Sequence, residues 1–206
     1  MIYRIFKRTA DIISSVMLLL AISPVMVVLA VLVRVKLGGP VFFKQVRTGM
    51  NMKPFHMIKF RTMTSACDEN GELLPDEKRQ TPFGVWLRNT SLDELPELFN
   101  IIRGDMSVIG PRPLPVSYDM YYSKRERSRF NVRGGLITPD CIDPNPMISW
   151  DKQLEYDAEY GTDLTVSKDM KVFFSVFRIL CSRSQADYGA VVRKPLNIER
   201  NNKIYE

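Results

Sequence analysis

A long apolar stretch constrains this chain more than any other feature. Residues Ile12 to Val33 carry no charged side chain and consist mostly of Ile, Val, Leu, Met and Ala. At about 1.5 Å per residue, a straight helix of this length measures roughly 33 Å, enough to cross a hydrocarbon core of about 30 Å. The stretch exceeds the ~7 to 15 residue core of a signal peptide, and no small-residue cleavage motif follows it. We therefore expect a membrane segment that stays in the mature protein.

Ser23 and Pro24 lie in the middle of this stretch. Proline removes a backbone donor and clashes with the preceding turn, so it bends or breaks a helix. Basic residues, which favour the cytosolic side of a membrane, stand on both flanks: Arg4, Lys7 and Arg8 before it, and Arg34 and Lys36 after it. A re-entrant helix-break-helix keeps both flanks in the cytosol. A spanning helix with a kink and a buried core helix are the alternatives.

The rest of the chain has a soluble composition and room for one domain. We expect a membrane anchor over residues 1–36, a cytosolic globular domain over 37–193 and a mobile tail over 194–206. Lys and Arg exceed Asp and Glu by 29 to 23, a balance that suits phosphate, an acidic membrane surface or nucleic acid. Because no recognition motif accompanies the charge, nucleic acid is the least favoured of these partners.

The pattern along the domain predicts a mainly α fold with a small β-hairpin, an α+β class. Apolar runs at residues 40–43 and 55–59, separated by Gly49 and Pro54, predict the hairpin. Residues 64–80 are polar and read as a loop with helical pieces. Leu92, Leu95, Leu98, Phe99 and Ile102 have helical spacing, and this helix is expected to end near Gly104.

The second half of the domain gives weaker signals. Residues 110–115 predict a stiff extended turn, 120–129 a short basic and aromatic helix, and 134–146 an irregular stretch rich in Gly and Pro. Residues 168–183 predict a helix that gathers apolar residues on one side: Met170, Phe173, Phe174, Phe177 and Leu180. This helix belongs either to the core or to the membrane interface, as an interfacial amphipathic helix does.

Asp93 and Glu94 are the candidate catalytic pair, because they open a predicted helix with Arg88 upstream and Arg112 downstream. A positive helix end with neighbouring guanidinium groups attracts phosphate. An aspartate can attack a phosphoryl centre, while a second carboxylate holds Mg²⁺ or removes a proton. The alternative is structural, because Ser91 to Glu94 fits the capping box S-x-x-E.

Lys59 and Arg61 stand two residues apart on a predicted strand and therefore share a face. They form either a phosphate clamp or a solvated face. No GxxxxGK[ST] loop, GxGxxG turn, HExxH or G-x-S-x-G motif occurs in the chain, which argues against several common nucleotide-binding and hydrolytic classes.

Taken together, five motifs resemble those of the bacterial monotopic phosphoglycosyl transferases, which are polyprenol-phosphate sugar-1-phosphate transferases. In this chain they read Lys7-Arg8, Ser23-Pro24, Lys59-Phe60-Arg61-Thr62-Met63, Ser91-Leu92-Asp93-Glu94-Leu95-Pro96 and Gly104-Asp105-Met106-Ser107-Val108-Ile109-Gly110-Pro111-Arg112-Pro113. They keep the family's order and spacing from about residue 3 to 133. The length is similar to that of the family's minimal catalytic members.

The resemblance implies a ping-pong reaction with a UDP-sugar donor and a polyprenol phosphate acceptor, such as undecaprenyl phosphate. Asp93 would attack the β-phosphorus, UMP would leave, and the covalent phosphosugar would pass to the acceptor. Glu94 would assist as a base or, with Asp93, as a Mg²⁺ partner. Phosphate oxygens would be bound by Lys59, Arg61, Arg88, Arg112 and Arg133.

The resemblance also implies a monotopic protein of the bacterial inner membrane, with the helix break at Ser23 and Pro24 and the active site on the cytosolic face. Membrane lipids are expected partners, and a homodimer is one option for assembly. Residues 134–144 depart from the family's pattern, since this loop has lost an arginine and an amide and gained Asp140 and Asp143. We therefore predict an altered or narrow sugar preference.

Overall fold

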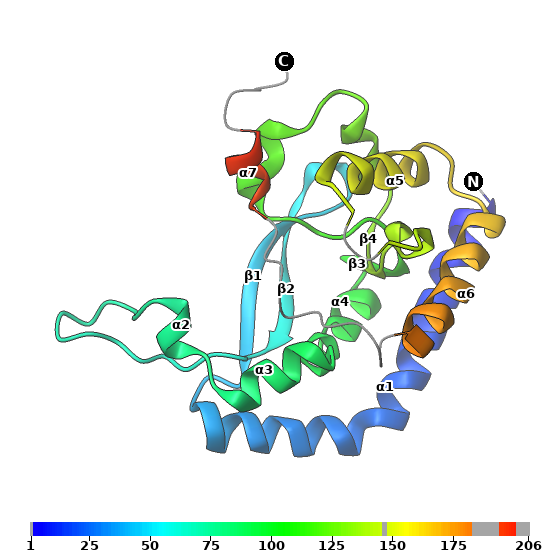
Figure 1. Cartoon of the computed structure of the whole chain (residues 1–206). Coiled ribbons are helices and arrows are strands. Elements are labelled where there is room, and N and C mark those ends of the chain that lie inside the picture. The colour runs from blue at the N-terminus through cyan, green and yellow to red at the C-terminus, as the bar shows by residue number, and fades with distance from the viewer. Residues whose placement is uncertain (1, 146–147, 183–193, 201–206) are drawn as a thin grey trace.

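The computed structural model describes residues 2–145, 148–182 and 194–200. Helices predominate over short strands in these ranges, which confirms the expected mainly α class with a small β component (Figure 1). The helices are α1 (Ile2–Leu37), α2 (Asp76–Arg79), α3 (Pro82–Asn89), α4 (Glu97–Arg103), α5 (Trp150–Thr162), α6 (Val166–Ser182) and α7 (Leu196–Glu199). The strands are β1 (Phe42–Thr48), β2 (Pro54–Phe60), β3 (Met106–Ile109) and β4 (Gly134–Ile137).

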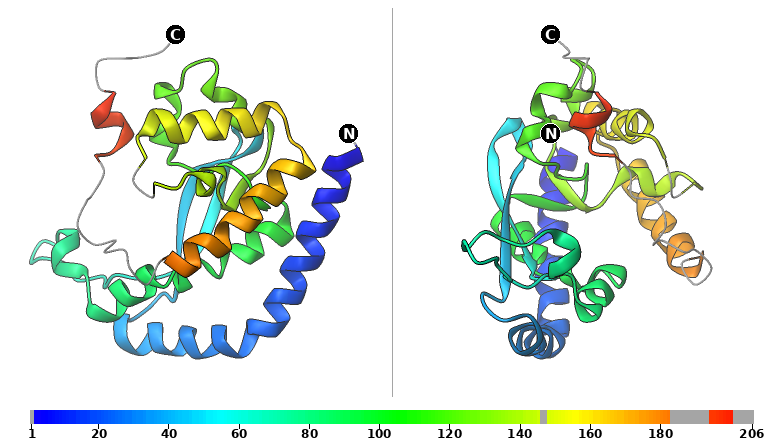
Figure 2. Two further views of the ribbon diagram at one scale, coloured as in Figure 1. Left: turned by 45° about the vertical axis from the view of Figure 1, so that its right-hand side comes forward. Right: turned by 60° about the vertical axis from the view of Figure 1, so that its left-hand side comes forward.

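Helix α1 contains Pro24 and bends sharply near its middle, so that its two halves wrap around the domain (Figures 1 and 2). Proline cannot donate to the carbonyl of Leu20, four residues earlier. The hydroxyl of Ser23 donates to that carbonyl instead, at 2.9 Å. The expected break is therefore a bend within one continuous helix, because the serine satisfies the acceptor that the proline leaves free.

Most of the apolar surface of α1 faces away from the domain. The helix is long and apolar enough to cross a membrane, and only 17% of its most apolar window is buried. Its buried side, made by Met26, Leu29, Val33 and Leu37, packs in the cluster that also holds Phe60. This low burial argues against the core-helix alternative, whereas the spanning and re-entrant alternatives both fit it.

Polar contacts fasten the first half of α1 to the domain. Asp11 is buried and accepts a hydrogen bond from the Ser107 hydroxyl at 2.6 Å. Arg8 donates to the carbonyls of Ile101 and Ile102 at 2.7 and 3.0 Å, at the C-terminal end of α4. These contacts join the first half of α1 to β3 and to the C-terminal end of α4.

Strands β1 and β2 form the predicted antiparallel hairpin, with Gln45 opposite Met57 and Arg47 opposite Phe55. Side chains at alternate positions share a face of such a pair. Arg47, Met57 and Lys59 therefore point to the same side of the hairpin, toward α4 and the chain that follows β3.

A parallel pair that the sequence did not predict joins β3 to β4, with Met106 opposite Gly134. The backbones approach so closely that a Cβ on Gly135 would lie 2.0 Å from the Gly110 nitrogen. The expectation of an irregular stretch from residue 134 was therefore wrong at its start. Glycines that permit close backbone contact look like turn signals in a sequence.

The predicted helix from Leu92 begins later than expected. Leu92–Glu94 forms a 3-10 turn, and α4 follows from Glu97, with Pro96 before it. Its end at Gly104 is confirmed, since this residue has φ of 103° and takes the left-handed conformation that glycine tolerates. The helix expected over residues 120–129 is replaced by two 3-10 segments, Val116–Tyr121 and Glu126–Asn131.

Helix α6 confirms the helix predicted from residue 168 and turns its apolar side outward. Val172 is fully buried, whereas Met170, Phe173 and Phe174 are 44%, 43% and 61% exposed. The side chains of Phe177 and Leu180 lie outside the described ones. The described side chains favour the membrane-interface alternative over the core alternative.

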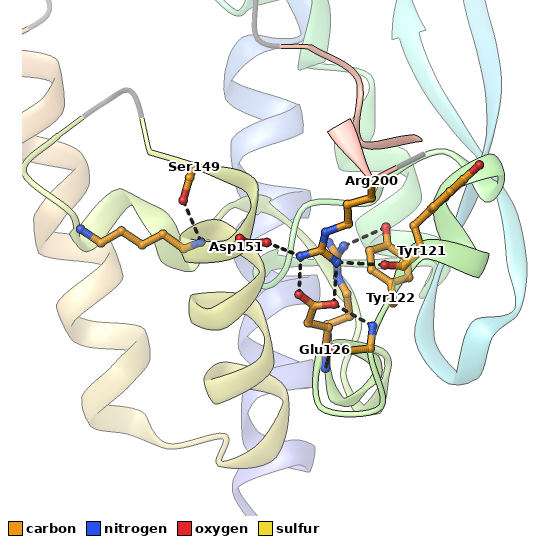
Figure 3. A network of polar contacts seen from close by, with 9 residues as sticks. Tyr121, Tyr122, Glu126, Ser149, Asp151 and Arg200 are labelled. Atoms are coloured by element: carbon orange, nitrogen blue, oxygen red, sulfur yellow. Dashed lines mark hydrogen bonds and ion pairs between the residues drawn. The ribbon is translucent and has the colours of Figure 1, made fainter. Parts of the chain in front are cut away.

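Part of the expected mobile tail packs on the domain. Leu196 of α7 is fully buried beside Leu154. The Arg200 guanidinium forms ion pairs with Glu126, at 2.9 Å, and with Asp151 (Figure 3). Leu196 and Ile198 are too few apolar residues to give a periodic signal in a polar stretch, so the sequence did not reveal this helix. Residues 201–206 lie outside the described part.

Candidate active site

Asp93 and Glu94 sit in the 3-10 turn before α4, and the Asp93 side chain is buried. A capping residue normally has an extended backbone. Ser91 instead has φ of 55°, in the left-handed region. The Glu94 carboxylate accepts hydrogen bonds from Lys59 and Arg112. The capping-box alternative therefore does not describe this turn. Glu94 instead lines a cavity, the first of two at this site, together with Lys59 and Arg112.

Lys59 lies between two carboxylates. Its Nζ is 2.6 Å from Glu94 Oε1 and 3.2 Å from Glu97 Oε1. Arg112 Nη2 is 3.0 Å from the same Glu94 oxygen. One carboxylate oxygen thus holds two cations on the wall of the cavity, and both cations keep further N–H groups for an anion.

A buried amide sets the position of Lys59 relative to α4. Asn100 Nδ2 donates to the His56 carbonyl at 2.8 Å, and its Oδ1 accepts from the Ile58 nitrogen at 3.0 Å. Asn100 is fully buried, one helical turn after Glu97. The two hydrogen bonds fix the register of β2 against α4, which brings Lys59 to the carboxylates.

The three carboxyl groups have different acidities. Burial raises the pKa of Asp93, and the charge of Lys59 opposes this rise. Burial acts on Glu94 as well, but Arg112 and Lys59 outweigh it and hold the pKa of Glu94 below its ordinary value. Burial raises the pKa of Glu97 to about 7 despite Lys59. Carboxyl groups whose acidities are pushed apart in one site are typical of acid, base and nucleophile roles.

Arg61 and Arg88 line a second cavity, of about 350 Å³. Arg88 Nε donates to the Thr62 hydroxyl at 2.9 Å, and Arg61 Nη1 to the Gly39 carbonyl at 2.8 Å. The charge of Arg88 lowers the pKa of Asp93, although burial has the larger effect in the other direction. Arg88 therefore lies within electrostatic reach of Asp93.

Arg133 lies in a different place from the other predicted phosphate-binding residues. Its Nε donates to the Gly104 carbonyl at 2.8 Å, and it lines a cavity with Lys7 and Arg8 near the N-terminal end of α1. The structure thus groups Lys59, Asp93, Glu94 and Arg112, adds Arg61 and Arg88 next to them, and leaves Arg133 at the end of α4.

Two residues of the first cavity were missed in the sequence. Arg47 and Glu97 line it together with Lys59, Glu94 and Arg112. No motif in the sequence singles out either residue. The hairpin register could have placed Arg47 on the face of Lys59, because both positions follow from the antiparallel pairing.

Asp93 and Glu94 offer the hard oxygen donors that Mg²⁺ prefers. In the described part of the chain, no group of three or more His, Cys, Asp or Glu side chains is placed to hold a metal ion. This donor set fits a cation that binds with the oxygens of a substrate and water, as Mg²⁺ commonly does in phosphoryl-transfer sites.

A buried aspartate beside lysine and arginine side chains, in a domain carried by an apolar helix, is typical of a membrane-associated phosphoryl-transfer enzyme. Comparison with known proteins defines the class. Residues 2–183 match the family model of the bacterial sugar transferases. The chain belongs to this family, and the resemblance to the phosphoglycosyl transferases is confirmed.

Individual relatives of the chain are also named as sugar transferases. The chain is 41% identical over 179 residues to the uncharacterised sugar transferase EpsL of Bacillus subtilis, covering 86% of this chain and 89% of EpsL. It is 37% and 36% identical to the UDP-glucose:undecaprenyl-phosphate glucose-1-phosphate transferases of Klebsiella pneumoniae and Escherichia coli, covering 87% and 85% of this chain. The chain spans only 41% and 40% of the length of those two relatives.

Proposed function

We propose that this protein transfers a sugar 1-phosphate from a UDP-sugar to polyprenol phosphate, giving a polyprenyl diphosphate sugar and UMP. The observation that carries the proposal is the buried carboxylate of Asp93 beside Glu94, with Lys59 and Arg112 held on Glu94. The relatives from Klebsiella and Escherichia are named for the same reaction class with UDP-glucose and undecaprenyl phosphate. The protein would then act at the first membrane step of glycoconjugate assembly.

In the first half-reaction, an Asp93 oxygen forms a bond to the β-phosphorus of the donor. The bond between this phosphorus and the oxygen that bridges to the α-phosphorus breaks, and UMP leaves with that oxygen. Burial favours this step because water does not shield the attacking carboxylate. The result is a covalent phosphosugar on Asp93.

In the second half-reaction, an oxygen of polyprenol phosphate attacks the same phosphorus and releases Asp93. Glu94 takes the proton of the acceptor phosphate, if it carries one, and this proton leaves with solvent. Arg112 and Lys59 hold the pKa of Glu94 below its ordinary value against the effect of burial, so this carboxylate is ionised at neutral pH and accepts a proton only as a weak base. Phosphoryl transfer depends mainly on such positioning and charge neutralisation.

Two pairs of cations bind the donor's diphosphate. Lys59 and Arg112 hold it from the cavity that contains Glu94, and Arg88 and Arg61 act from the second cavity. Mg²⁺, bound by Asp93 and Glu94 together with phosphate oxygens, would supply further neutralisation of the leaving UMP. Arg133, at the end of α4, takes no part in these steps.

The membrane arrangement is also a proposal. A re-entrant α1, bent near Pro24, would make the protein monotopic in the bacterial inner membrane, with the active site on the cytosolic face. Single cysteines at Arg4→Cys and Lys36→Cys, in a chain whose three native cysteines are replaced, test it in intact cells. Protection of both positions from an impermeant thiol reagent supports the re-entrant form, and labelling of either one from outside overturns it.

UMP release tests the reaction directly. Detergent-solubilised protein is mixed with Mg²⁺, polyprenol phosphate and a panel of UDP-sugars, beside an Asp93→Asn variant. Acceptor-dependent release by the parent alone supports the proposal and names the donor. A donor preference equal to that of a relative with the usual 134–144 loop would contradict the predicted change in sugar preference.

A further inference from the structure

The cavity beside Glu94 holds more positive than negative groups. Three cations line it, Arg47, Lys59 and Arg112, together with the carboxylates of Glu94 and Glu97. The pKa of Glu97 is raised by burial to about 7, so at neutral pH this group carries only part of a charge. A cavity with such a balance attracts an anion.

The backbone of Arg47 is tied to the segment that carries Arg112. The nitrogen of Thr48 donates to the Leu114 carbonyl at 3.2 Å, and Arg47 bridges to Pro115 across the same pair of segments. Arg47 Nη2 also donates to Gln45 Oε1 at 2.6 Å, on its own strand. The backbone contacts fix Arg47 beside the segment of Arg112, Gln45 holds one end of its guanidinium, and the side chain lines the cavity.

Two observations show that Arg47 is poorly satisfied by the protein itself. Burial lowers its pKa, and the like charge of Arg112 lowers it further. Its Nε is buried and has no hydrogen-bond partner within the described residues. A buried donor without an acceptor and a nearby like charge both destabilise the ligand-free protein. An anion in the cavity would offset the repulsion between Arg47 and Arg112, which both line it.

We propose that Arg47 is a phosphate-binding residue of this enzyme and that it holds the donor's diphosphate together with Arg112. The inference rests on the proposed function. Guanidinium groups bind phosphate oxygens with a rigid fork of N–H donors, which a lysine cannot reproduce. Two forks on neighbouring segments hold a diphosphate in a defined orientation, with its β-phosphorus toward Asp93.

Nucleotide binding separates this role from a structural one. An Asp93→Asn background removes turnover, and UDP binding to it is measured by calorimetry in detergent. Arg47→Met should weaken UDP binding by about 10- to 100-fold, as expected for loss of a charged hydrogen bond. Binding of uridine, followed by ligand-observed NMR, should stay unchanged because uridine has no phosphate. Arg47→Lys should fall between the parent and Arg47→Met.

Lys44→Met is the matched control, since Lys44 is an exposed cation on the same strand and points to the opposite face of the hairpin. It removes the same charge and should leave UDP binding unchanged. If Lys44→Met weakened UDP binding as much as Arg47→Met does, the loss of affinity would be an effect of net charge, and the proposal would be overturned. Equal UDP affinity in Arg47→Met and its parent, or equal losses for UDP and uridine, would also overturn it.

UMP release from the protein with Asp93 intact separates the two proposals. If that protein releases UMP and Arg47→Met raises KM for the donor, both hold. If it releases UMP and Arg47→Met has the parent's KM, only the role of Arg47 fails. If no donor gives UMP, the reaction proposal fails, and the UDP titration still decides whether Arg47 binds phosphate.

Discussion

Arg129 and Asp157 form an ion pair inside the domain, with 2.9 Å between Nη2 and Oδ2 and side chains only 2% and 0% exposed. Arg129 Nη2 also donates to the backbone carbonyl of Arg112 at 2.5 Å, and Nη1 to the Tyr122 hydroxyl at 3.1 Å. Burial raises the pKa of Asp157 to about 7 even though Arg129 opposes this. The pair thus holds the backbone of a residue whose side chain contacts Glu94.

Removing one partner of this pair should cost both stability and activity. Asp157→Asn leaves the Arg129 charge uncompensated, and breaking a buried pair destabilises by about 3 to 5 kcal/mol. The double variant Arg129→Met, Asp157→Leu should regain stability because it fills the site with apolar groups. Its kcat should stay low, since the Arg112 carbonyl has lost its donor. Chemical denaturation and UMP release measure the two effects.

Arg200→Met is the control for this experiment. It removes the ion pairs to Glu126 and Asp151, which make no contact with Arg112 among the interactions described. Stability should fall while kcat, measured well below the unfolding temperature, stays at the parent value. A double variant that regains full kcat along with stability would show that Arg129 and Asp157 do not position Arg112.

Asp93→Asn should abolish turnover without unfolding the protein. Asparagine has nearly the same shape, and burial already disfavours the charged form of Asp93, so the neutral amide should cost little stability. Loss of a nucleophile should lower kcat by at least about 10³-fold. Intact-mass measurement after mixing with donor alone should show a sugar-phosphate adduct on the parent and on Glu94→Gln, and none on Asp93→Asn. An adduct on Asp93→Asn would assign the nucleophile elsewhere.

The elements that the sequence predicted correctly carry strong local signals. The apolar run of α1, the alternating strands around Gly49 and Pro54, and the glycine that ends α4 each follow from nearby residues. The pairing of Asp93 with Glu94 near arginines was visible as a motif. The local pattern left two alternatives, a capping box and a catalytic pair, because both fit S-x-x-E, and the left-handed backbone of Ser91 argues against the first.

The elements that were missed depend on distant contacts. β3 and β4 pair although a connection of more than twenty residues separates them in the sequence. The close approach of the backbones at Gly110 and Gly135 explains why both positions are glycine. Arg47 enters the active site through strand register and through the contact of Thr48 with Leu114. The burial of Leu196 depends on a cluster whose other members stand far from it in the sequence: Leu114, Tyr122, Phe130 and Leu154.

Glu97→Gln should change how stability depends on pH. Because the pKa of Glu97 rises from 4.5 to about 7 on folding, the folded state binds this proton more tightly. Stability therefore decreases as pH rises from 4.5 to about 7, by at most roughly 3 kcal/mol. The glutamine variant lacks this loss, so its unfolding free energy should fall less between pH 5 and pH 8. Parallel curves for the parent and the variant would contradict the raised pKa.

Leu196→Ala should show that α7 belongs to the folded domain. Leu196 is fully buried with Leu154 and Tyr122, and shortening a buried leucine costs about 2 to 5 kcal/mol. Ile198→Ala, on the same helix and 58% exposed, is the matched control and should change stability by less than about 0.5 kcal/mol. Equal stability of both variants and the parent would mean that the segment does not pack on the domain in solution.

The outward side of α6 should contact lipid. Phe173 and Phe174 are 43% and 61% exposed while Val172 on the same helix is fully buried, and such a face lowers its free energy at the boundary of head groups and acyl chains. A Phe174→Cys variant of a chain without its native cysteines is labelled with a polarity-sensitive dye and mixed with detergent-free vesicles of either neutral or anionic lipid. If charge governs the contact, the dye emission shifts to the blue only with anionic vesicles. If apolar burial governs it, the emission shifts to the blue with both kinds of vesicle. The second result is expected, with quenching by brominated lipids. A label at Glu155→Cys, an exposed position on α5, should remain unquenched. Absence of quenching at Phe174→Cys would contradict the contact of α6 with lipid, and equal quenching at both positions would show that the contact is not specific to the outward side of α6.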